Sequence, residues 1–194
     1  MIRLGIIGST RGTAMSAIQL AIEQQRLSAR IVIVISNKST ALILERAKAS
    51  GLATQLIDPT ELSREAYDQQ VSICLQQHRI DLVILIGYMR ILSHDFVDEW
   101  QHKLMNVHPS LLPAFAGKID LDVHRAVLAA GAKETGCTVH YVTREVDAGP
   151  IIVQKRCAVL SGDTPEELKK RVQALEGEAL IEAIGRFSVY PSSR

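Results

Sequence analysis

The sequence predicts an α/β protein built on an open, mostly parallel, Rossmann-like sheet with helices on both faces and an antiparallel C-terminal addition. The first observation behind this fold class is that short apolar runs alternate with helical patterns up to about Gly87, as they do in β-α-β units. The second is that two β-rich runs flank the turn Val146–Pro150, as the strands of a hairpin would.

Four strands and three helices are predicted before Gly87. Each strand is a short, mainly apolar run closed by glycine or polar residues, and they lie at Ile2–Gly8, Ile31–Ile35, Thr54–Ile57 and Asp81–Gly87. The first helix places small and apolar residues on one face, the second has Gly51 just past its end, and the third has Ser63 as its N-cap. These helices are expected at Thr13–Gln25, at Ser39–Ala49 and from Ser63 to about Gln77.

The rest of the chain is predicted to hold fewer helices and more antiparallel structure. A short apolar run leads to Asn106, and a helix follows near Val123–Ala130. The two hairpin strands are expected at Thr135–Val142 and Ile151–Val159. A last helix is expected to begin with Asp163 or Thr164 as N-cap and Pro165 at its first position, and to run to about Arg186.

Composition and charge exclude several classes of protein. With 194 residues, 47% hydrophobic and 22% charged, the chain is expected to form one globular domain. A net charge of +1 argues against general nucleic-acid binding. The three cysteines, Cys74, Cys137 and Cys157, are widely spaced and indicate neither a disulfide framework nor a metal site. No apolar run is long enough for a membrane span or a signal peptide, so we expect a cytoplasmic protein without membrane or nucleic-acid partners.

Polar residues cluster just past the carboxyl ends of the predicted strands, where open α/β sheets bind ligands. The first of these loops, Gly8–Thr13, lies between a strand and a helix, where backbone N–H groups favour an anion. The loop lacks a P-loop lysine and does not match G-x-G-x-x-G, so a small phosphate monoester is a better ligand than ATP or a dinucleotide. A purely structural glycine turn is the alternative interpretation.

Asn106 and His108 are two residues apart, so on an extended strand their side chains leave the same face. An asparagine amide can donate to a developing oxyanion, and histidine titrates near neutral pH. Pro109 and Pro113 keep the following segment out of a helix. In isolation this pattern also fits a strand end with a capping asparagine and a satisfied histidine. Asp147, in the turn Val146–Pro150, would add a carboxylate to the pair.

Three segments, N-x-H-P-S-L-L-P, G-Y-M-R-I-L and V-D-A-G-P-I-I, together resemble the signature of the folate-dependent formyltransferases, in family order and over nearly the whole chain. Within that family the chain resembles members that act on glycinamide ribonucleotide. The resemblance implies transfer of a formyl group from 10-formyltetrahydrofolate, a co-substrate, to the amine of glycinamide ribonucleotide in purine biosynthesis, without a metal. It also implies a single domain, 1–194, with a phosphate-binding half at 1–100 and a catalytic, folate-binding half at 101–194.

The resemblance also assigns roles to individual residues. Asn106 and His108 would stabilise the oxyanion, while Asp147 would favour the charged form of His108 and help to move the proton. Thr138 and His140 would orient Asp147. The remaining positions are Arg11, Gly12, Thr13 and Ala14 for the substrate phosphate, Arg64, Met89, Arg90, Leu92, Val142 and Thr143 for folate, and Gln173 and Glu176 for the amine end of the substrate.

The chain departs from the family pattern on the acceptor side. Ala14 stands where most relatives have asparagine, and Arg11 is the residue that could compensate. The segment from Gly117 to His124 is a few residues longer than in many relatives, so we expect a different substrate wall there and assign His124 no catalytic role.

Four other functions share parts of this pattern. Methionyl-tRNA formyltransferase and formyltetrahydrofolate hydrolase normally carry an additional domain, and the length of this chain disfavours both. A sugar-nucleotide formyltransferase would have a different acceptor site, and a non-catalytic phosphate-binding module would not need Asn106, His108 and Asp147 together. The expected partners are small-molecule substrates, and the expected assembly is a monomer or homodimer.

Overall fold

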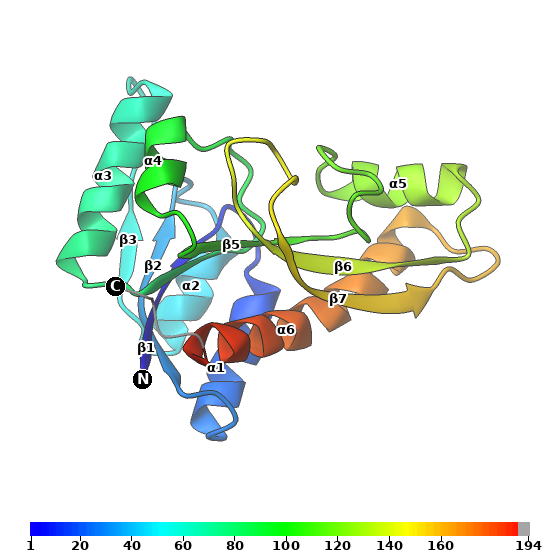
Figure 1. Ribbon diagram of the computed structural model, residues 1–194, viewed down its shortest axis with the longest axis horizontal. Coiled ribbons are helices and arrows are strands. Elements are labelled where there is room, and N and C mark those ends of the chain that lie inside the picture. Colours follow the sequence, from blue (N-terminus) through cyan, green and yellow to red (C-terminus); the bar gives the residue numbers. More distant parts are fainter. Residues whose placement is uncertain (190–194) are drawn as a thin grey trace.

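The structure is a computed structural model that describes residues 1–189. Within these residues the chain forms one seven-stranded sheet with the order β3-β2-β1-β4-β5-β6-β7 (Figure 1). The elements, in chain order, are β1 (Ile2–Ile7), α1 (Thr13–Glu23), β2 (Ala29–Ser36), α2 (Leu42–Ala49), β3 (Thr54–Leu56), α3 (Arg64–Gln77), β4 (Leu82–Leu85), α4 (His94–Glu99), β5 (Leu104–His108), α5 (Leu121–Ala129), β6 (Glu134–Tyr141), β7 (Ile151–Ala158) and α6 (Pro165–Val189).

The direction of the strands confirms the predicted fold class. Strands β1 to β5 pair in parallel, while β6 runs antiparallel to both β5 and β7. The chain winds outward from β1 to β3 on one side, then returns to place β4 against the other side of β1. Between β1 and β4 the connections therefore leave in opposite directions, and this is the point at which open α/β sheets bind ligands.

Both faces of the sheet are covered by helices. Alternate residues of β4 show this directly, because Leu82 and Ile84 pack in one apolar cluster while Val83 and Leu85 pack in another. The first cluster contains residues of α1, α2 and α6, and the second contains residues of α3 and α4. A run of four buried residues thus serves two cores, which explains why β4 reads as continuously apolar.

The helices α3 and α6 begin at their predicted capping residues, whereas α2 begins later than predicted. Ser63 accepts a hydrogen bond from the N–H of Ala66 at 3.1 Å, and Thr164 exchanges hydrogen bonds with Glu167 as in a capping box. Helix α2 begins at Leu42 and not at Ser39, because the residues after β2 form a turn closed by the Lys38 N–H on Ser36 Oγ at 3.2 Å. Helix α4 was not predicted from the sequence, because it has only six residues.

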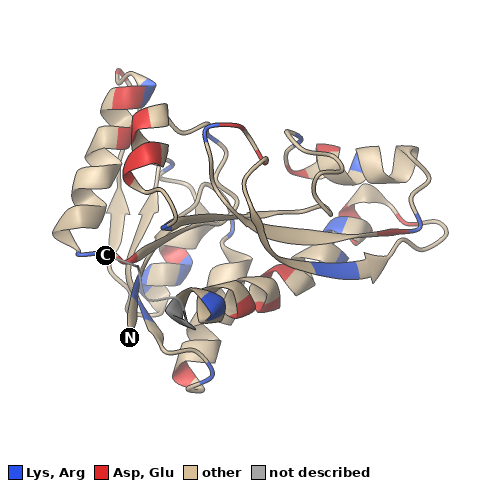
Figure 2. Ribbon diagram, viewed as in Figure 1, with Lys and Arg blue, Asp and Glu red and all other residues tan. Residues whose placement is uncertain are grey.

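Charged residues are spread over the helices and loops (Figure 2), and acidic residues are prominent on α4, which carries Asp95, Asp98 and Glu99. Within residues 1–189, no helix has both the length and the apolar character needed to cross a bilayer.

Candidate active site

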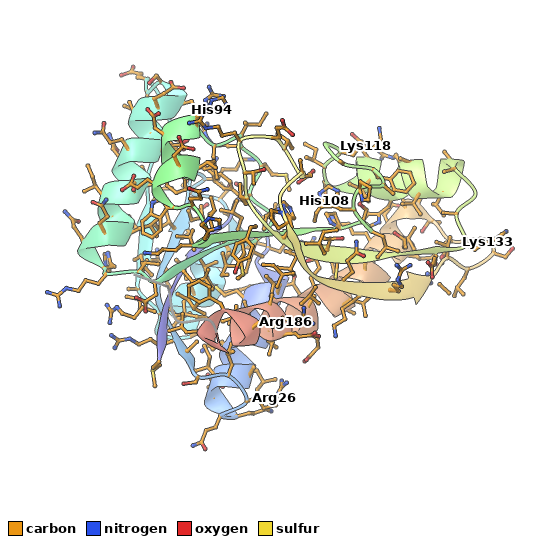
Figure 3. All side chains as sticks on the ribbon, viewed as in Figure 1. Arg26, His94, His108, Lys118, Lys133 and Arg186 are labelled. Atoms are coloured by element: carbon orange, nitrogen blue, oxygen red, sulfur yellow. The ribbon has the colours of Figure 1, made fainter. Side chains whose placement is uncertain are left out.

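A cleft of about 840 Å³ opens beyond the carboxyl ends of β1, β4 and β5. Figure 3 labels His108 at the end of β5 and, near it, Lys118 on the loop that leads to α5; both residues line this cleft. The cleft brings together most of the site residues that the sequence predicted: Arg11, Gly12, Thr13, Met89, Arg90, Leu92, Asn106, His108, His140, Val142, Thr143, Asp147, Gln173 and Glu176.

Three predicted site residues lie outside the lining of the cleft. Ala14 is buried in the first turn of α1. Thr138 is buried in β6. Arg64 lies at the start of α3, where its guanidinium pairs with the neighbouring Glu65 carboxylate at 3.1 Å, and its side chain is 48% exposed.

Asn106 is positioned by β5 and by its cross-strand neighbour. The register of β5 and β6 places Asn106 opposite His140, and the Asn106 Nδ2 lies 3.2 Å from His140 Nε2. His140 Nδ1 is 2.9 Å from the Tyr141 carbonyl, so Nδ1 carries the proton and Nε2 accepts. The Asn106 amide therefore donates one N–H to His140 Nε2, and its second N–H can donate to a ligand in the cleft.

Asp147 is held in the turn between β6 and β7 with its backbone in the left-handed region, at a φ of 55°. Asp is one of the few residues other than glycine that adopts this conformation readily. Gly149 permits the turn because a Cβ there would lie 1.8 Å from the Tyr141 carbonyl oxygen. The turn can therefore close against Tyr141 only with glycine at this position, and it directs the Asp147 carboxylate back toward β5.

The Asp147 carboxylate contacts both site histidines. Its Oδ2 lies 3.2 Å from His108 Nδ1, its Oδ1 lies 3.6 Å from His140 Nε2, and Oδ2 accepts the Gly117 N–H at 2.8 Å. Burial alone would raise the pKa of Asp147, but the Gly117 N–H and the nearby His108 together lower the pKa below its usual value of 3.8. Asp147 is therefore an anion at neutral pH.

His108 is buried, with 4% of its surface exposed. Burial lowers its pKa, the Asp147 charge and the Phe115 carbonyl raise it, and the balance lies below the usual value of 6.5. Asp147 thus favours the charged form of His108, but desolvation of the imidazolium outweighs the effect of the carboxylate. The resting His108 is neutral, and its Nε2 lies 3.3 Å from the Phe115 carbonyl.

Thr138 supports the segment after β5 and makes its hydrogen bonds there. Its hydroxyl donates to the Ser110 carbonyl at 2.7 Å and accepts the Leu112 N–H at 3.0 Å. Gln154 on β7 donates to the Leu112 carbonyl at 2.9 Å. The proline-flanked segment is thereby fixed against the sheet, and with it the direction in which the chain leaves His108.

The loop after β1 is closely packed. Gly12 has a φ of 65°, and a Cβ there would lie 2.3 Å from Ile43 Cγ1. The Ile43 N–H donates to the Thr10 carbonyl at 3.0 Å, which ties the loop to α2. Ser9 accepts the Met89 N–H at 3.2 Å. The loop therefore presents the free N–H groups at the start of α1 on a rigid support, an arrangement that favours an anion.

Helix α6 forms the far side of this anion-binding end. Gly177 packs so closely on α1 that a Cβ there would lie 2.5 Å from the Ala17 Cβ. Thr13 and Gln173 lie one helical turn before Ala17 and Gly177, and both line the cleft. Burial raises the pKa of Glu176, in the same helix, to about 7. This end of the cleft thus lies between α1 and α6, where the N–H groups at the start of α1 favour an anion.

The loop after β4 forms a second, more apolar end. Met89, Arg90 and Leu92 line it, and the Arg90 guanidinium lies 4.7 Å from the centre of the Tyr67 ring. The Arg90 Nε is buried without a hydrogen-bond partner among the described residues. This end can accept a flat, partly apolar ligand, and Tyr67 fixes the arginine beside it.

Several residues of the site were missed by sequence reasoning. The Phe115 carbonyl and the Gly117 N–H act through the backbone, so no side-chain pattern reveals them. Tyr67 contacts Arg90 from α3, and Lys169 of α6 pairs with Asp120, but long sequence separations hide both contacts. Within residues 1–189, no group of three or more His, Cys, Asp or Glu side chains is placed to hold a metal ion.

Known proteins resemble this chain in sequence and in fold. The family model described as "Formyl transferase" matches residues 2–184. The chain is 40% identical over 172 residues to phosphoribosylglycinamide formyltransferase of Escherichia coli (strain K12), covering 88% of this chain and 80% of that protein. The crystal structure of glycinamide ribonucleotide transformylase 1 from Symbiobacterium toebii superimposes with a TM-score of 0.93 at 40% identity, over 100% of this chain and 92% of that one.

The chain also resembles part of a much longer protein. It is 40% identical over 184 residues to the trifunctional purine biosynthetic protein adenosine-3 of Gallus gallus. The alignment covers 94% of this chain and 18% of that protein. The chain thus spans about a fifth of that relative. Because one family model covers nearly the whole chain, the chain belongs to the formyl transferase family.

Proposed function

We propose that this protein transfers the formyl group of 10-formyltetrahydrofolate to the amine of glycinamide ribonucleotide, a step of purine biosynthesis. The observation that carries the proposal is the meeting of Asn106, His108 and Asp147 in one cleft, with the His108 Nδ1 and Asp147 Oδ2 3.2 Å apart. An anion-binding loop lies at one end of this cleft and an apolar slot at the other. Two substrates can therefore meet at the triad.

Each half of the cleft is assigned one substrate. The ribonucleotide phosphate binds the N–H groups of Gly12 and Thr13, and Arg11 supplies the side-chain contact that Ala14 lacks. Gln173 and Glu176 contact the amine end of the same substrate. The folate binds along Met89, Arg90 and Leu92 and against Val142 and Thr143, with Arg64 nearer the surface.

The chemistry follows from the resting protonation states. The substrate amine attacks the formyl carbon, and the carbonyl oxygen becomes an oxyanion that accepts the free N–H of Asn106. The proton released by the amine passes to neutral His108, directly or through water, and Asp147 stabilises the imidazolium that forms. Protonated His108 donates from Nε2 to the oxyanion. When the bond to the folate nitrogen breaks, the proton moves to that nitrogen as it leaves.

The biological setting is part of the same proposal. The protein would act in the cytoplasm on small-molecule substrates, as a monomer or homodimer, with 10-formyltetrahydrofolate as co-substrate and no metal. Residues 1–100 would supply most of the phosphate site, and residues 101–194 would supply the triad.

The direct test is to measure consumption of 10-formyltetrahydrofolate with and without glycinamide ribonucleotide. The proposal requires consumption only when the acceptor is present. Consumption without an acceptor would indicate a hydrolase. Tight binding of a phosphate ligand without consumption would indicate a non-catalytic module, and transfer only to a sugar nucleotide would indicate a different acceptor class.

Asn106→Ala tests the oxyanion contact. Removal of one oxyanion donor typically lowers kcat by about 10²–10³-fold, and the KM for either substrate should change far less. A control for folding is the thermal unfolding midpoint of the variant. Near-normal kcat in a folded Asn106→Ala variant would contradict the assignment.

A further inference from the structure

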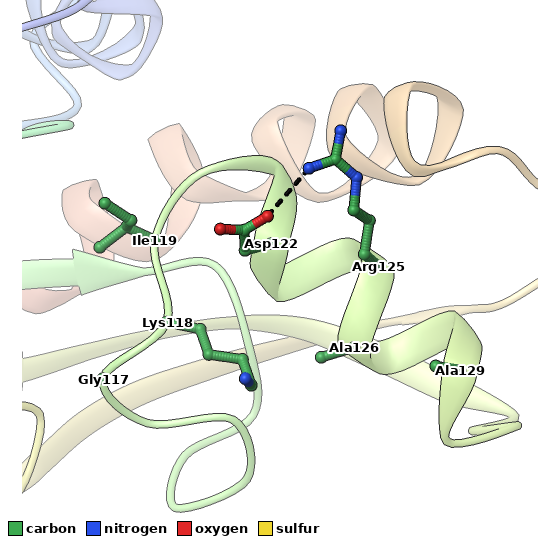
Figure 4. Close-up of a pocket in the computed structure, with 7 residues that line it drawn as sticks. All are labelled: Gly117, Lys118, Ile119, Asp122, Arg125, Ala126 and Ala129. Atoms are coloured by element: carbon green, nitrogen blue, oxygen red, sulfur yellow. Dashed lines mark hydrogen bonds and ion pairs between the residues drawn. The ribbon is translucent and has the colours of Figure 1, made fainter.

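The loop of residues 117–120 is a thin wall beside the triad. Gly117, Lys118 and Ile119 line both the main cleft and a shallow hollow of about 470 Å³ on the α5 side. Figure 4 shows Lys118 and Ile119 leaving the loop on opposite sides, and Asp122 and Arg125 of α5 paired with each other. This wall belongs to the segment from Gly117 to His124, which leads from β5 to α5.

The wall is anchored at both ends. At one end the Gly117 N–H donates to Asp147 Oδ2 at 2.8 Å. At the other end the Asp120 carboxylate pairs with the Nζ of Lys169 on α6. Only Lys118 and Ile119 lie between the two anchors, so a shift of Asp120 is transmitted to the peptide that holds Asp147.

Asp120 is held in an unusual backbone conformation. Its φ of 48° and ψ of −128° lie outside the regions that L-residues prefer. Asp120 precedes α5, a position where an aspartate normally caps the helix, yet it makes no side-chain cap hydrogen bond. The carboxylate is directed to Lys169 instead. The ion pair therefore holds a residue whose backbone is strained.

We propose that Lys169 is a positioning residue for formyl transfer: through Asp120 it fixes the 117–120 wall, so that the Gly117 N–H keeps the Asp147 carboxylate against His108. This inference rests on the function proposed above. Lys169 acts through the loop and does not touch the reacting atoms.

The test compares two lysine variants that each break an ion pair between α6 and another element. Lys169→Met breaks the pair with Asp120, whose partners have side chains 29% and 49% exposed. The matched control, Lys155→Met, breaks the 2.5 Å pair between Lys155 on β7 and Glu182 on α6, with 36% and 37% exposed. Neither Lys155 nor Glu182 lines the cleft.

We expect Lys169→Met to lower kcat by about tenfold, because small displacements of a catalytic group are costly, while the KM for 10-formyltetrahydrofolate stays unchanged. Lys155→Met should keep the wild-type kcat, and both variants should have similar thermal unfolding midpoints. Lys169→Arg, which retains the ion pair, should restore most of kcat.

Asp120→Asn gives an independent check. If the two residues act as one unit, Asp120→Asn should lower kcat as Lys169→Met does, and the double variant should be no worse than either single variant. Additive losses, a kcat of Lys169→Met equal to that of Lys155→Met, or a raised acceptor KM with unchanged kcat would each overturn the inference. These results are distinct from failure of the proposed function, in which the wild-type protein itself makes no formylated product.

Discussion

His108 illustrates why the protonation state of a site residue depends on its full surroundings. A neighbouring carboxylate favours the charged imidazole, and the contact between His108 Nδ1 and Asp147 Oδ2 at 3.2 Å is close enough to do so. Burial acts in the opposite direction and outweighs it. The result is a neutral histidine beside an ionised aspartate, which is the state that can receive a proton from an attacking amine.

The ring resonances of His108, followed by NMR as a function of pH, should test this state. The titration midpoint should lie below the usual 6.5, because burial lowers the pKa of His108. In Asp147→Asn the midpoint should move lower still, because the charge that raises the pKa of His108 is gone. The resonances can be assigned by their loss in His108→Asn. A midpoint above the usual value, or an upward shift in Asp147→Asn, would contradict the balance described here.

Glu176 carries a second pH dependence, in the stability of the protein. Its pKa is raised from 4.5 to about 7 by burial, so the folded state holds a proton that the unfolded state has already lost. This contribution to stability is fully present below the unfolded pKa and is lost as the pH rises through the folded pKa. Protonation of Glu176 at low pH therefore raises the free energy of unfolding.

Chemical denaturation at about pH 5 and about pH 8 can measure this effect. The wild-type protein should lose more unfolding free energy between these pH values than Glu176→Gln, which has no proton to lose. Glu178→Gln is a matched control, because Glu178 lies two residues further along α6 with a side chain 60% exposed, and it should follow the wild type. Equal losses in the wild type and Glu176→Gln would contradict the assignment.

At the scale of elements, the turn between β6 and β7 determines where Asp147 lies. Residues Val146–Pro150 leave β6 and return to pair with it, since the Tyr141 N–H donates to the Pro150 carbonyl at 3.0 Å. Gly149 passes against Tyr141 so closely that no side chain fits. The glycine of the motif is therefore required for the approach of the turn to β6, and it places the carboxylate indirectly.

Gly149→Ala should consequently lower kcat without touching any reacting group. The added Cβ would lie 1.8 Å from the Tyr141 carbonyl oxygen, so the turn has to move and Asp147 moves with it. A displacement of about 1 Å in such a site can cost about 10²-fold in rate. The thermal unfolding midpoint of Gly149→Ala is the control for folding. A wild-type kcat in the folded variant would show that the turn tolerates the extra methyl group.

Some helices could be predicted from the local sequence, and others could not. Long periodic segments and clear caps, such as Ser63 and Thr164, were predicted close to their observed positions because the signals are local. Helix α4 was missed because six residues are too few for a helical period, although Ser93 and Asp95 at its start follow the capping pattern. The start of α2 was predicted too early because the turn at Ser36–Lys38 depends on hydrogen bonds after β2.

At the scale of the whole molecule, the sequence predicted the fold class and a common rim for the polar loops. It could not predict the register that pairs Asn106 with His140, because pairing depends on contacts between residues far apart in the chain. The same limit applies to the Asp120–Lys169 ion pair and to the opposing effects of burial and of Asp147 on the pKa of His108. Alternation along one strand indicates which side chains share a face, but the tertiary structure determines which residues they contact.

We propose that formyl transfer occurs where the two ends of the cleft meet at Asn106, His108 and Asp147. A single-turnover experiment with isotope-labelled 10-formyltetrahydrofolate and glycinamide ribonucleotide can test this. The wild-type protein should move the label to the ribonucleotide amine, and a folded Asp147→Asn variant that still binds both substrates should transfer it far more slowly. Label released as free formate, or transfer by Asp147→Asn at the wild-type rate, would contradict the claim.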